Sequence, residues 1–276
     1  MTHALWPRFR RSKLAVAALV YVGLMTIIAI VAPMLSPFGP DDVDVVNRLR
    51  SPDAVHRLGT DDLGRDVLAR MIHGARISLT VGYSATALAL IIGSLLGALA
   101  GYYGGAVDWV VSRLIEVVLC FPFLFLVLGI VALFRPSLWT IMIALGLTTW
   151  TSEARFVRGE FLRLRGLEFA QAARASGARD RRIIFRHLLP NALAPVLVSA
   201  SFGVAGAIVT ESALSFLGFG LPPPTASWGS ILSTAQQYID YAWWLVVFPG
   251  VAIFTTVAAF NIIGDRFRDA LDPRSE

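Results

Sequence analysis

Long uncharged segments alternate with polar ones along the chain. Six apolar segments can be drawn, at residues 14–32, 77–107, 117–134, 138–152, 188–210 and 241–264. An α-helix rises about 1.5 Å per residue, so roughly 20 apolar residues cross a hydrocarbon core about 30 Å thick. The fourth segment is short, and its helix is predicted to continue through the charged residues that follow it. The pattern therefore predicts an all-α polytopic membrane protein with six transmembrane helices.

The polar segments divide the chain into two parts. Residues 1–76 hold a basic N-terminal segment, the first apolar segment and a long polar loop, and residues 77–276 hold a core of five helices. The first apolar segment exceeds the roughly 7–15 residues of a secretory signal and lacks a convincing cleavage site, so we expect a retained helix. In the loop, Asp62 is expected to cap a short helix that ends at His73, with Gly74 after it.

The distribution of charge predicts the orientation. The chain is 56% hydrophobic and 16% charged, whereas about a quarter of the residues are charged in a soluble domain. With the N-terminus inside, residues 1–13, 108–116, 153–187 and 265–276 face the cytoplasm and carry 17 of the 24 basic residues. Cytoplasmic loops are enriched in Lys and Arg. Both termini are therefore predicted on the cytoplasmic side, with the long loop between helices 1 and 2 outside.

Few residues suggest catalysis or a metal site. Cys120 is the only cysteine, and none of the four histidines lies within an apolar segment. Ser84, in Gly-Tyr-Ser, faintly resembles an intramembrane serine nucleophile, but no membrane histidine is available as its base. The aspartates around Asp61 lack the alternate spacing and closing Glu of an EF-hand, which favours a structural turn over a calcium site. We expect no catalytic residue and no metal.

Three features of the apolar segments bear on packing and gating. Gly93, Gly97 and Gly101 recur every four residues and predict a close helix contact. Pro122 can kink the third helix. Glu211 lies towards the outer end of the fifth helix, where an acidic group is costly, and both a hydrogen-bonding role and a pore-lining or gating role stay open. Pro122 and Glu211 are the candidate gating or pathway residues.

The most informative polar segment is residues 165–191. It predicts two short helices, at residues 167–176 and 180–188, with Gly177 between them to take the positive φ of a sharp turn. Pro190 is expected to end the second helix. This helix places Ile183, Ile184 and Leu188 on one side and is amphipathic. An apolar face on a cytoplasmic helix pair predicts a protein partner.

The same segment resembles the cytoplasmic coupling loop of ABC-importer permeases. Their pattern is Glu-Ala-Ala, three residues, Gly, nine residues, Ile, one residue, Leu-Pro. The chain keeps every spacing, with Gln171 in place of Glu and His187 in place of Ile. An ordinary loop between two helices is the alternative interpretation. The resemblance implies the following ATPase-coupling residues: Glu168, Gln171, Ala172, Ala173, Gly177, Arg181, Ile183, His187, Leu189 and Pro190.

Two outer motifs narrow the resemblance. Residues 58–66, Leu-Gly-Thr-Asp-Asp-Leu-Gly-Arg-Asp, and residues 227–229, Ser-Trp-Gly, are similar to motifs of the dipeptide, oligopeptide and nickel branch of these permeases. The resemblance implies a permease subunit of an ATP-driven importer that moves di- or oligopeptides across a bacterial plasma membrane by alternating access. Nickel or another chelated solute is the alternative cargo. An ATP-independent channel and a membrane-anchored scaffold are the alternatives from other classes.

The resemblance also implies the partners of the chain. They are a second permease of similar fold, two cytoplasmic ATPase subunits that hold ATP and Mg, and an external substrate-binding protein. The chain has no Gly-x-x-x-x-Gly-Lys phosphate-binding loop. We therefore expect a transport subunit that is not itself an enzyme and binds no cofactor, embedded in lipid and without a nucleic-acid partner.

Overall fold

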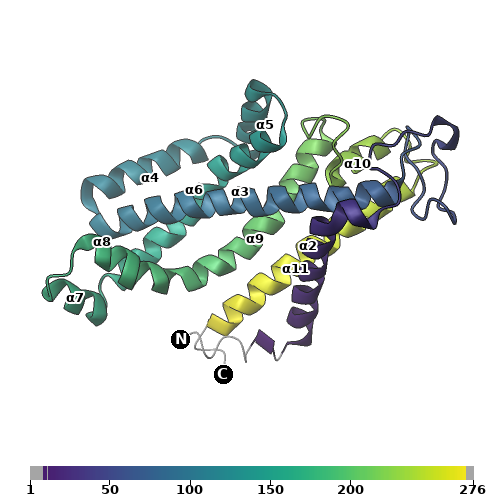
Figure 1. Cartoon of the computed structure of the whole chain (residues 1–276). Coiled ribbons are helices and arrows are strands. Elements are labelled where there is room, and N and C mark those ends of the chain that lie inside the picture. The colour runs from purple at the N-terminus through teal and green to yellow at the C-terminus, as the bar shows by residue number, and fades with distance from the viewer. Residues whose placement is uncertain (1–8, 11, 272–276) are drawn as a thin grey trace.

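The computed structural model describes residues 9–10 and 12–271, and within that range its named elements are all helical (Figure 1). Their bounds are α2 Lys13–Leu35, η1 Val45–Asn47, α3 Val67–Tyr103, α4 Gly105–Leu119, α5 Phe123–Phe134, α6 Leu138–Leu164, α7 Glu168–Ala175, α8 Asp180–Arg182, η2 Ile183–Leu188, α9 Leu189–Phe216, α10 Trp228–Ala235 and α11 Trp244–Leu271. The predicted all-α class is confirmed.

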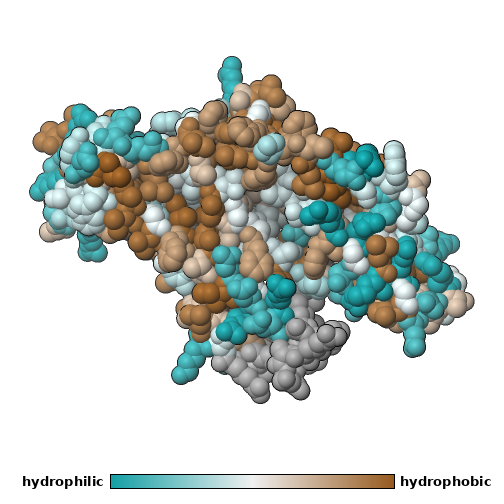
Figure 2. Space-filling view, turned by 180° about the vertical axis from the view of Figure 1, so that it is seen from behind, coloured by the Kyte–Doolittle hydropathy of each residue, from teal (hydrophilic) through white to brown (hydrophobic). Residues whose placement is uncertain are grey.

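Four of these helices, α2, α3, α9 and α11, are long and apolar enough to cross a membrane, and the bent pair α4 and α5 makes up to five. Helix α6 corresponds to the fourth predicted span and continues from its apolar half into a charged one, as expected. Figure 2 shows hydrophilic residues gathered at opposite ends of the molecule, with a broad hydrophobic zone between them. The chain is therefore a multi-pass membrane protein.

Helix α3 corrects the predicted short outer helix. Asp66, not Asp62, caps it by accepting the backbone N–H of Ala69 at 2.8 Å, and the helix runs 37 residues without ending at Gly74. At about 1.5 Å per residue it is about 55 Å long, so it extends well beyond a hydrocarbon core. A Cβ on Gly74 would lie 3.2 Å from the backbone carbon of Ser227. This glycine therefore allows a close approach rather than a helix end.

The glycine stripe of α3 packs against α6, as predicted. A Cβ on Gly93 would lie 2.5 Å from the Cβ of Glu153, and one on Gly101 would lie 2.6 Å from the Cβ of Phe161. Real Cβ atoms are not found this close to other heavy atoms, so only glycine permits this spacing of the two helices. This close contact holds α6 along the C-terminal half of α3.

The third predicted span is broken rather than kinked. Helices α4 and α5 meet at 84°, and Pro122 stands at the break as the residue that precedes α5. Proline has no N–H to donate and its ring clashes with the preceding turn, which explains why the helix cannot continue through it. The expectation of a bend at Pro122 is confirmed, but the bend is sharp enough to turn α5 away from the axis of α4 (Figure 1).

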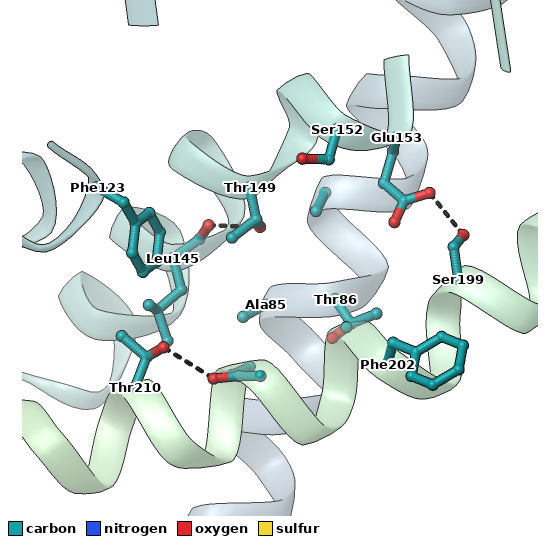
Figure 3. Close-up of a pocket in the computed structure, with 14 residues that line it drawn as sticks. Ala85, Thr86, Phe123, Leu145, Thr149, Ser152, Glu153, Ser199, Phe202 and Thr210 are labelled. Carbon is teal, nitrogen blue, oxygen red and sulfur yellow. Dashed lines mark hydrogen bonds between the residues drawn. The ribbon is translucent and has the colours of Figure 1, made fainter. Parts of the chain in front are cut away.

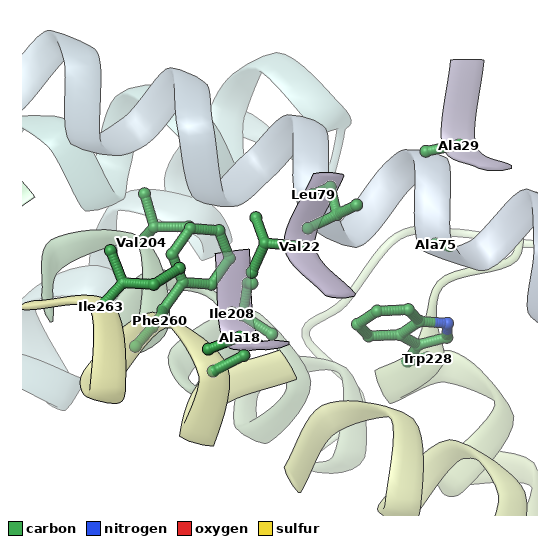
Figure 4. Close-up of a cluster of buried hydrophobic side chains, with 12 residues drawn as sticks. Ala18, Val22, Ala29, Ala75, Leu79, Val204, Ile208, Trp228, Phe260 and Ile263 are labelled. Atoms are coloured by element: carbon green, nitrogen blue, oxygen red, sulfur yellow. The ribbon is translucent and has the colours of Figure 1, made fainter. Parts of the chain in front are cut away.

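The main hydrophobic core lies where α2, α3, α9, α10 and α11 meet (Figure 4). Leu79 of α3, Ile208 of α9 and Trp228 of α10 are at most 2% exposed. The start of α2 and the end of α11 lie at one end of this bundle, because the rings of Phe9 and Phe267 stack with centroids 4.8 Å apart. Both ends of the described chain thus emerge on the same side, consistent with an even number of crossings.

An ion pair fastens α4 to α6 and supplies a first prediction. Asp108 binds Arg158 through both oxygens, with Nη2 and Oδ2 2.7 Å apart. The two side chains are 23% and 34% exposed, so solvent screens the pair and Asp108→Asn should cost only about 1 kcal/mol. Thermal unfolding in detergent measures the loss. Glu116→Gln, which breaks the more exposed Arg113 pair within α4, should leave the midpoint unchanged, and an equal shift in both variants would contradict this assignment.

Candidate functional site

The segment between α6 and α9 forms two helices joined at Gly177, as predicted. Gly177 has φ of 74°. Its N–H donates to the carbonyl of Arg174 at 3.0 Å, and the N–H of Ala178 donates to the carbonyl of Ala173 at 3.1 Å. These two bonds form a Schellman motif, which ends α7 and turns the chain into α8. We call residues 167–188 the α7–η2 element.

The second helix of this element differs from the prediction at its end. Asp180–Arg182 is α-helical and Ile183–Leu188 is a π-helix that passes directly into α9. Pro190 therefore does not end a helix, because it lies in the first turn of α9, directly after the π-helix. The element is joined to α9 without an intervening loop.

Apolar side chains anchor the element to the rest of the chain. Ile183, Ile184 and Leu188 are at most 3% exposed. They pack with Phe161 and Leu164 near the end of α6. The predicted apolar face of the second helix is thus confirmed, but it is covered by this chain's own α3 and α6, so it is not free for a partner.

Polar contacts tie the same element to the end of α3. The guanidinium of Arg165, in the turn between α6 and the element, donates to the carbonyls of Gly101 and Tyr102 at 2.9 and 3.1 Å. The hydroxyl of Tyr102 donates to Asp180 at 2.6 Å. Arg174 lies over the Tyr102 ring, 5.4 Å from its centroid, and its hydrogen bond with the Tyr102 hydroxyl raises the pKa of Arg174. Contacts and chain connections therefore fix the element to α3, α6 and α9.

The predicted coupling residues separate into two groups. Ile183 is buried, and Ala173, His187 and Leu189 are partly buried. The exposed residues are Glu168, Gln171, Ala172, Gly177, Arg181 and Pro190. The side-chain amide of Gln171 donates a hydrogen bond to the carbonyl of Gly166 at 3.0 Å. An ionised glutamate, the residue of the family pattern, could not form this bond because it has no proton to donate. The exposed face also carries Leu167 and Phe169, both 40% exposed, which the sequence pattern did not single out.

A cavity of about 440 Å³ lies between α3, α5, α6 and α9 (Figure 3). Its wall combines apolar residues with hydroxyls and one carboxylate, that of Glu153 on α6. Glu153 accepts a hydrogen bond from Ser199 of α9 at 2.7 Å. A charged carboxylate at the centre of a bilayer costs roughly 2.5–3.5 kcal/mol on insertion scales. Glu153 directly follows the apolar half of α6, so it too invites a functional explanation.

The two candidate pathway residues lie differently with respect to this cavity. Pro122 directly precedes Phe123, which lines the cavity. Glu211 has no exposed surface and accepts hydrogen bonds from Ser215 at 2.8 Å and Ser227 at 2.7 Å. Its carboxylate thus joins α9 to the start of α10 and is not in the cavity wall. The geometry supports the hydrogen-bonding alternative for Glu211.

The anchoring and cavity residues had no sequence signal of their own. Tyr102 and Asp180 are 78 positions apart, and Glu153 and Ser199 are 46 apart. Only the helix packing brings them together. The sequence shows that Glu153 directly follows an apolar segment. The charged residues after Glu153, however, indicated the polar end of a helix and not the wall of a cavity.

The fold and the site first define a class. Membrane-length helices around a cavity of apolar residues, hydroxyls and one carboxylate, with a helix-turn-helix element fastened to their ends, are the parts of a membrane transport subunit. Residues 93–276 match the family model of the binding-protein-dependent transport system inner membrane component, and residues 1–52 match that of the N-terminal transmembrane domain of oligopeptide transport permease C. The chain belongs to the binding-protein-dependent transport system inner membrane component family, as the coupling-loop resemblance implied.

Curated relatives and a solved structure agree with this assignment. The chain is 44% identical to the dipeptide transport system permease protein DppC of Alkalihalophilus pseudofirmus, over 97% of this chain and 88% of that protein. It is 39% identical to the oligopeptide transport system permease protein OppC of Bacillus subtilis, over 97% and 88%. A chain of the inward-facing MetNI methionine ABC transporter matches with a TM-score of 0.61 and 21% identity, over 75% of this chain and 98% of that one. That last likeness concerns the fold alone.

Proposed function

We propose that this chain is a membrane-spanning permease subunit of an ATP-driven importer of di- and oligopeptides in a bacterial plasma membrane. The printed names of the relatives at 39–44% identity support the peptide cargo. The uneven distribution of basic residues supports six spans with both termini in the cytoplasm, a long outer loop within residues 1–76, and a five-helix core in residues 77–276.

The partners follow from the same proposal. A second permease completes the pathway, two ATPase subunits bind ATP and Mg on the cytoplasmic side, and an external binding protein delivers the peptide. Glu168, Gln171, Ala172, Gly177 and Arg181 form the exposed face that meets an ATPase. Ile183 and Leu189 act from within, because they hold that face on the ends of the helices.

One observation carries the mechanism. The α7–η2 element lies between α6 and α9 without a flexible linker, and the same two helices line the cavity. When the ATPases close on ATP, the element moves α6 and α9 as rigid bodies and opens the cavity to one side of the membrane at a time. Rigid-body rocking of this kind is a common way of switching a transport pathway.

The wall of the cavity is compatible with a peptide and offers no site for a bare metal ion among the described residues. No group of three or more His, Cys, Asp or Glu that could hold a metal ion occurs among the described residues. The wall of the cavity instead offers hydroxyls, apolar surface and the single carboxylate of Glu153. A peptide carries all the complementary groups.

The test is reconstitution of the chain with its genomic neighbours in proteoliposomes. We expect uptake of a labelled peptide that requires ATP and the binding protein. Uptake without ATP would favour a channel, and a chain that purifies alone and moves no solute would favour a scaffold. Uptake of nickel but not peptide would reassign the cargo.

A further inference from the structure

The described part of the chain lines the cavity between α3, α5, α6 and α9 with one acidic side chain and with no basic one. Among the described residues that line it, Glu153 is the only one with an ionisable side chain. Ser199 bonds it at 2.7 Å, but the Ser199 hydroxyl also lies 2.8 Å from the carbonyl of Val196. A serine has one proton to donate, so the two acceptors compete for it. The carboxylate is left without a full set of donors.

The other hydroxyls of the cavity also present acceptors. Thr149 donates its proton to the carbonyl of Leu145 at 2.7 Å, and Thr210 donates to that of Gly206 at 2.8 Å. The oxygens of these two hydroxyls keep lone pairs that can accept a further hydrogen bond. Figure 3 shows both side chains at the cavity, with the bonds to the two carbonyls drawn. Thr86, 6% exposed, has a buried Oγ1 with no hydrogen-bond partner. A group with several protons to donate would satisfy these atoms.

A primary ammonium is such a group, because it has three donors and no acceptor. We propose that the cavity binds the protonated amino terminus of the peptide in transit, with Glu153 as its counter-ion and Thr86 among its neutral ligands. The cavity volume of about 440 Å³ lies within the range of about 300–1,000 Å³ usual for ligand pockets. A carboxylate or an anionic chelate would be repelled. The inference rests on the proposed peptide import and assigns to this permease a selectivity of its own.

The test compares two peptides that differ only at the amino terminus, trialanine and N-acetyl-trialanine. Uptake is measured with the complete complex in proteoliposomes, at saturating binding protein loaded with each peptide, so that affinity for the binding protein does not enter. Glu153→Gln should lower the maximal uptake of trialanine by about tenfold or more, as expected for loss of a charged hydrogen bond. Uptake of the acetylated peptide should change less than about twofold, since it carries no ammonium group to pair with Glu153.

Two further variants make the result decisive. Glu153→Asp keeps the charge and should retain uptake of trialanine within about threefold of the wild type. Glu160→Gln removes a carboxylate two turns along α6, where it pairs with Arg163 at 2.8 Å outside the cavity, and should transport like the wild type. Normal trialanine uptake by Glu153→Gln would overturn the proposal, as would a loss shared by Glu153→Asp, which indicates a structural role. If the wild type takes up neither peptide, the proposed function itself is overturned.

Discussion

Gly101→Leu is expected to prevent stable folding of the helix bundle. A Cβ at this position would lie 2.6 Å from the Cβ of Phe161 and 2.7 Å from the carbonyl oxygen of Arg158. These atoms belong to the backbone and first side-chain atoms of α6, so they cannot move aside as a flexible side chain would. Overpacking usually costs about 1–3 kcal/mol, and separating two close-packed helices places this change at about 3 kcal/mol or more. That is a large share of the roughly 5–15 kcal/mol that stabilises an ordinary protein.

The measurement is the unfolding midpoint and the monodisperse fraction in mild detergent. Gly159→Leu is the control, because Gly159 lies on α6 and a Cβ there would meet no atom within 4 Å. It should fold as the wild type does. A normal midpoint for Gly101→Leu, or an equal loss for Gly159→Leu, would show that the glycine stripe does not set the distance between α3 and α6.

The sequence predicted those parts of the fold that depend on local patterns. The spacing of Gly93, Gly97 and Gly101 indicated a contact face, and the structure places α6 against it. Gly74 shows the limit of such reasoning, because a glycine after an amphipathic turn fits a helix end and a packing contact equally well. Only the position of Ser227, 153 residues later, decides between them. The sequence also could not show that Pro190 begins α9, since proline both ends helices and starts them.

The same distinction applies to the candidate site. The turn at Gly177 was predictable because a positive φ, a local property, is needed there. The anchoring of the turn was not, because Tyr102 reaches Asp180 from the end of another helix, 78 positions earlier in the chain. Ile183 was expected on an exposed apolar face, yet packing against Phe161 buries it. Amphipathicity predicts that a face is covered but does not identify what covers it.

In the proposed mechanism, these anchors let a small element control a distant cavity. Tyr102 holds the element to α3, Arg165 fixes the end of α6 to the same part of α3, and α9 continues from the other end of the element. Glu153 lies within α6 and Ser199 within α9, so a shift between these two helices changes the hydrogen bond that joins them. In the proposed mechanism, closure of the ATPases would therefore alter the binding site for the peptide amine at the same time as the access to it.

Gly177→Val is expected to uncouple transport from ATP hydrolysis. A left-handed conformation costs an ordinary L residue roughly 1–2 kcal/mol, and it is worse for a β-branched one. A strain of about 1.4 kcal/mol changes the ratio between the populations of the native and the distorted turn by tenfold. A Cβ at Gly177, where φ is 74°, would meet no atom within 4 Å. The glycine is thus needed for its backbone conformation and not for space, so the substitution should distort the turn and leave the packing of the membrane helices intact.

Peptide uptake and ATP hydrolysis should be measured on the same proteoliposomes, and the peptides moved per ATP should fall by about tenfold or more in Gly177→Val. Gly177→Asn is the control, because asparagine tolerates the left-handed region and also adds a Cβ. It should keep most of the coupling. If both variants lose coupling equally, the added side chain disturbs a contact with the ATPase and the turn geometry is not the cause. If neither does, the α7–η2 element does not transmit the movement.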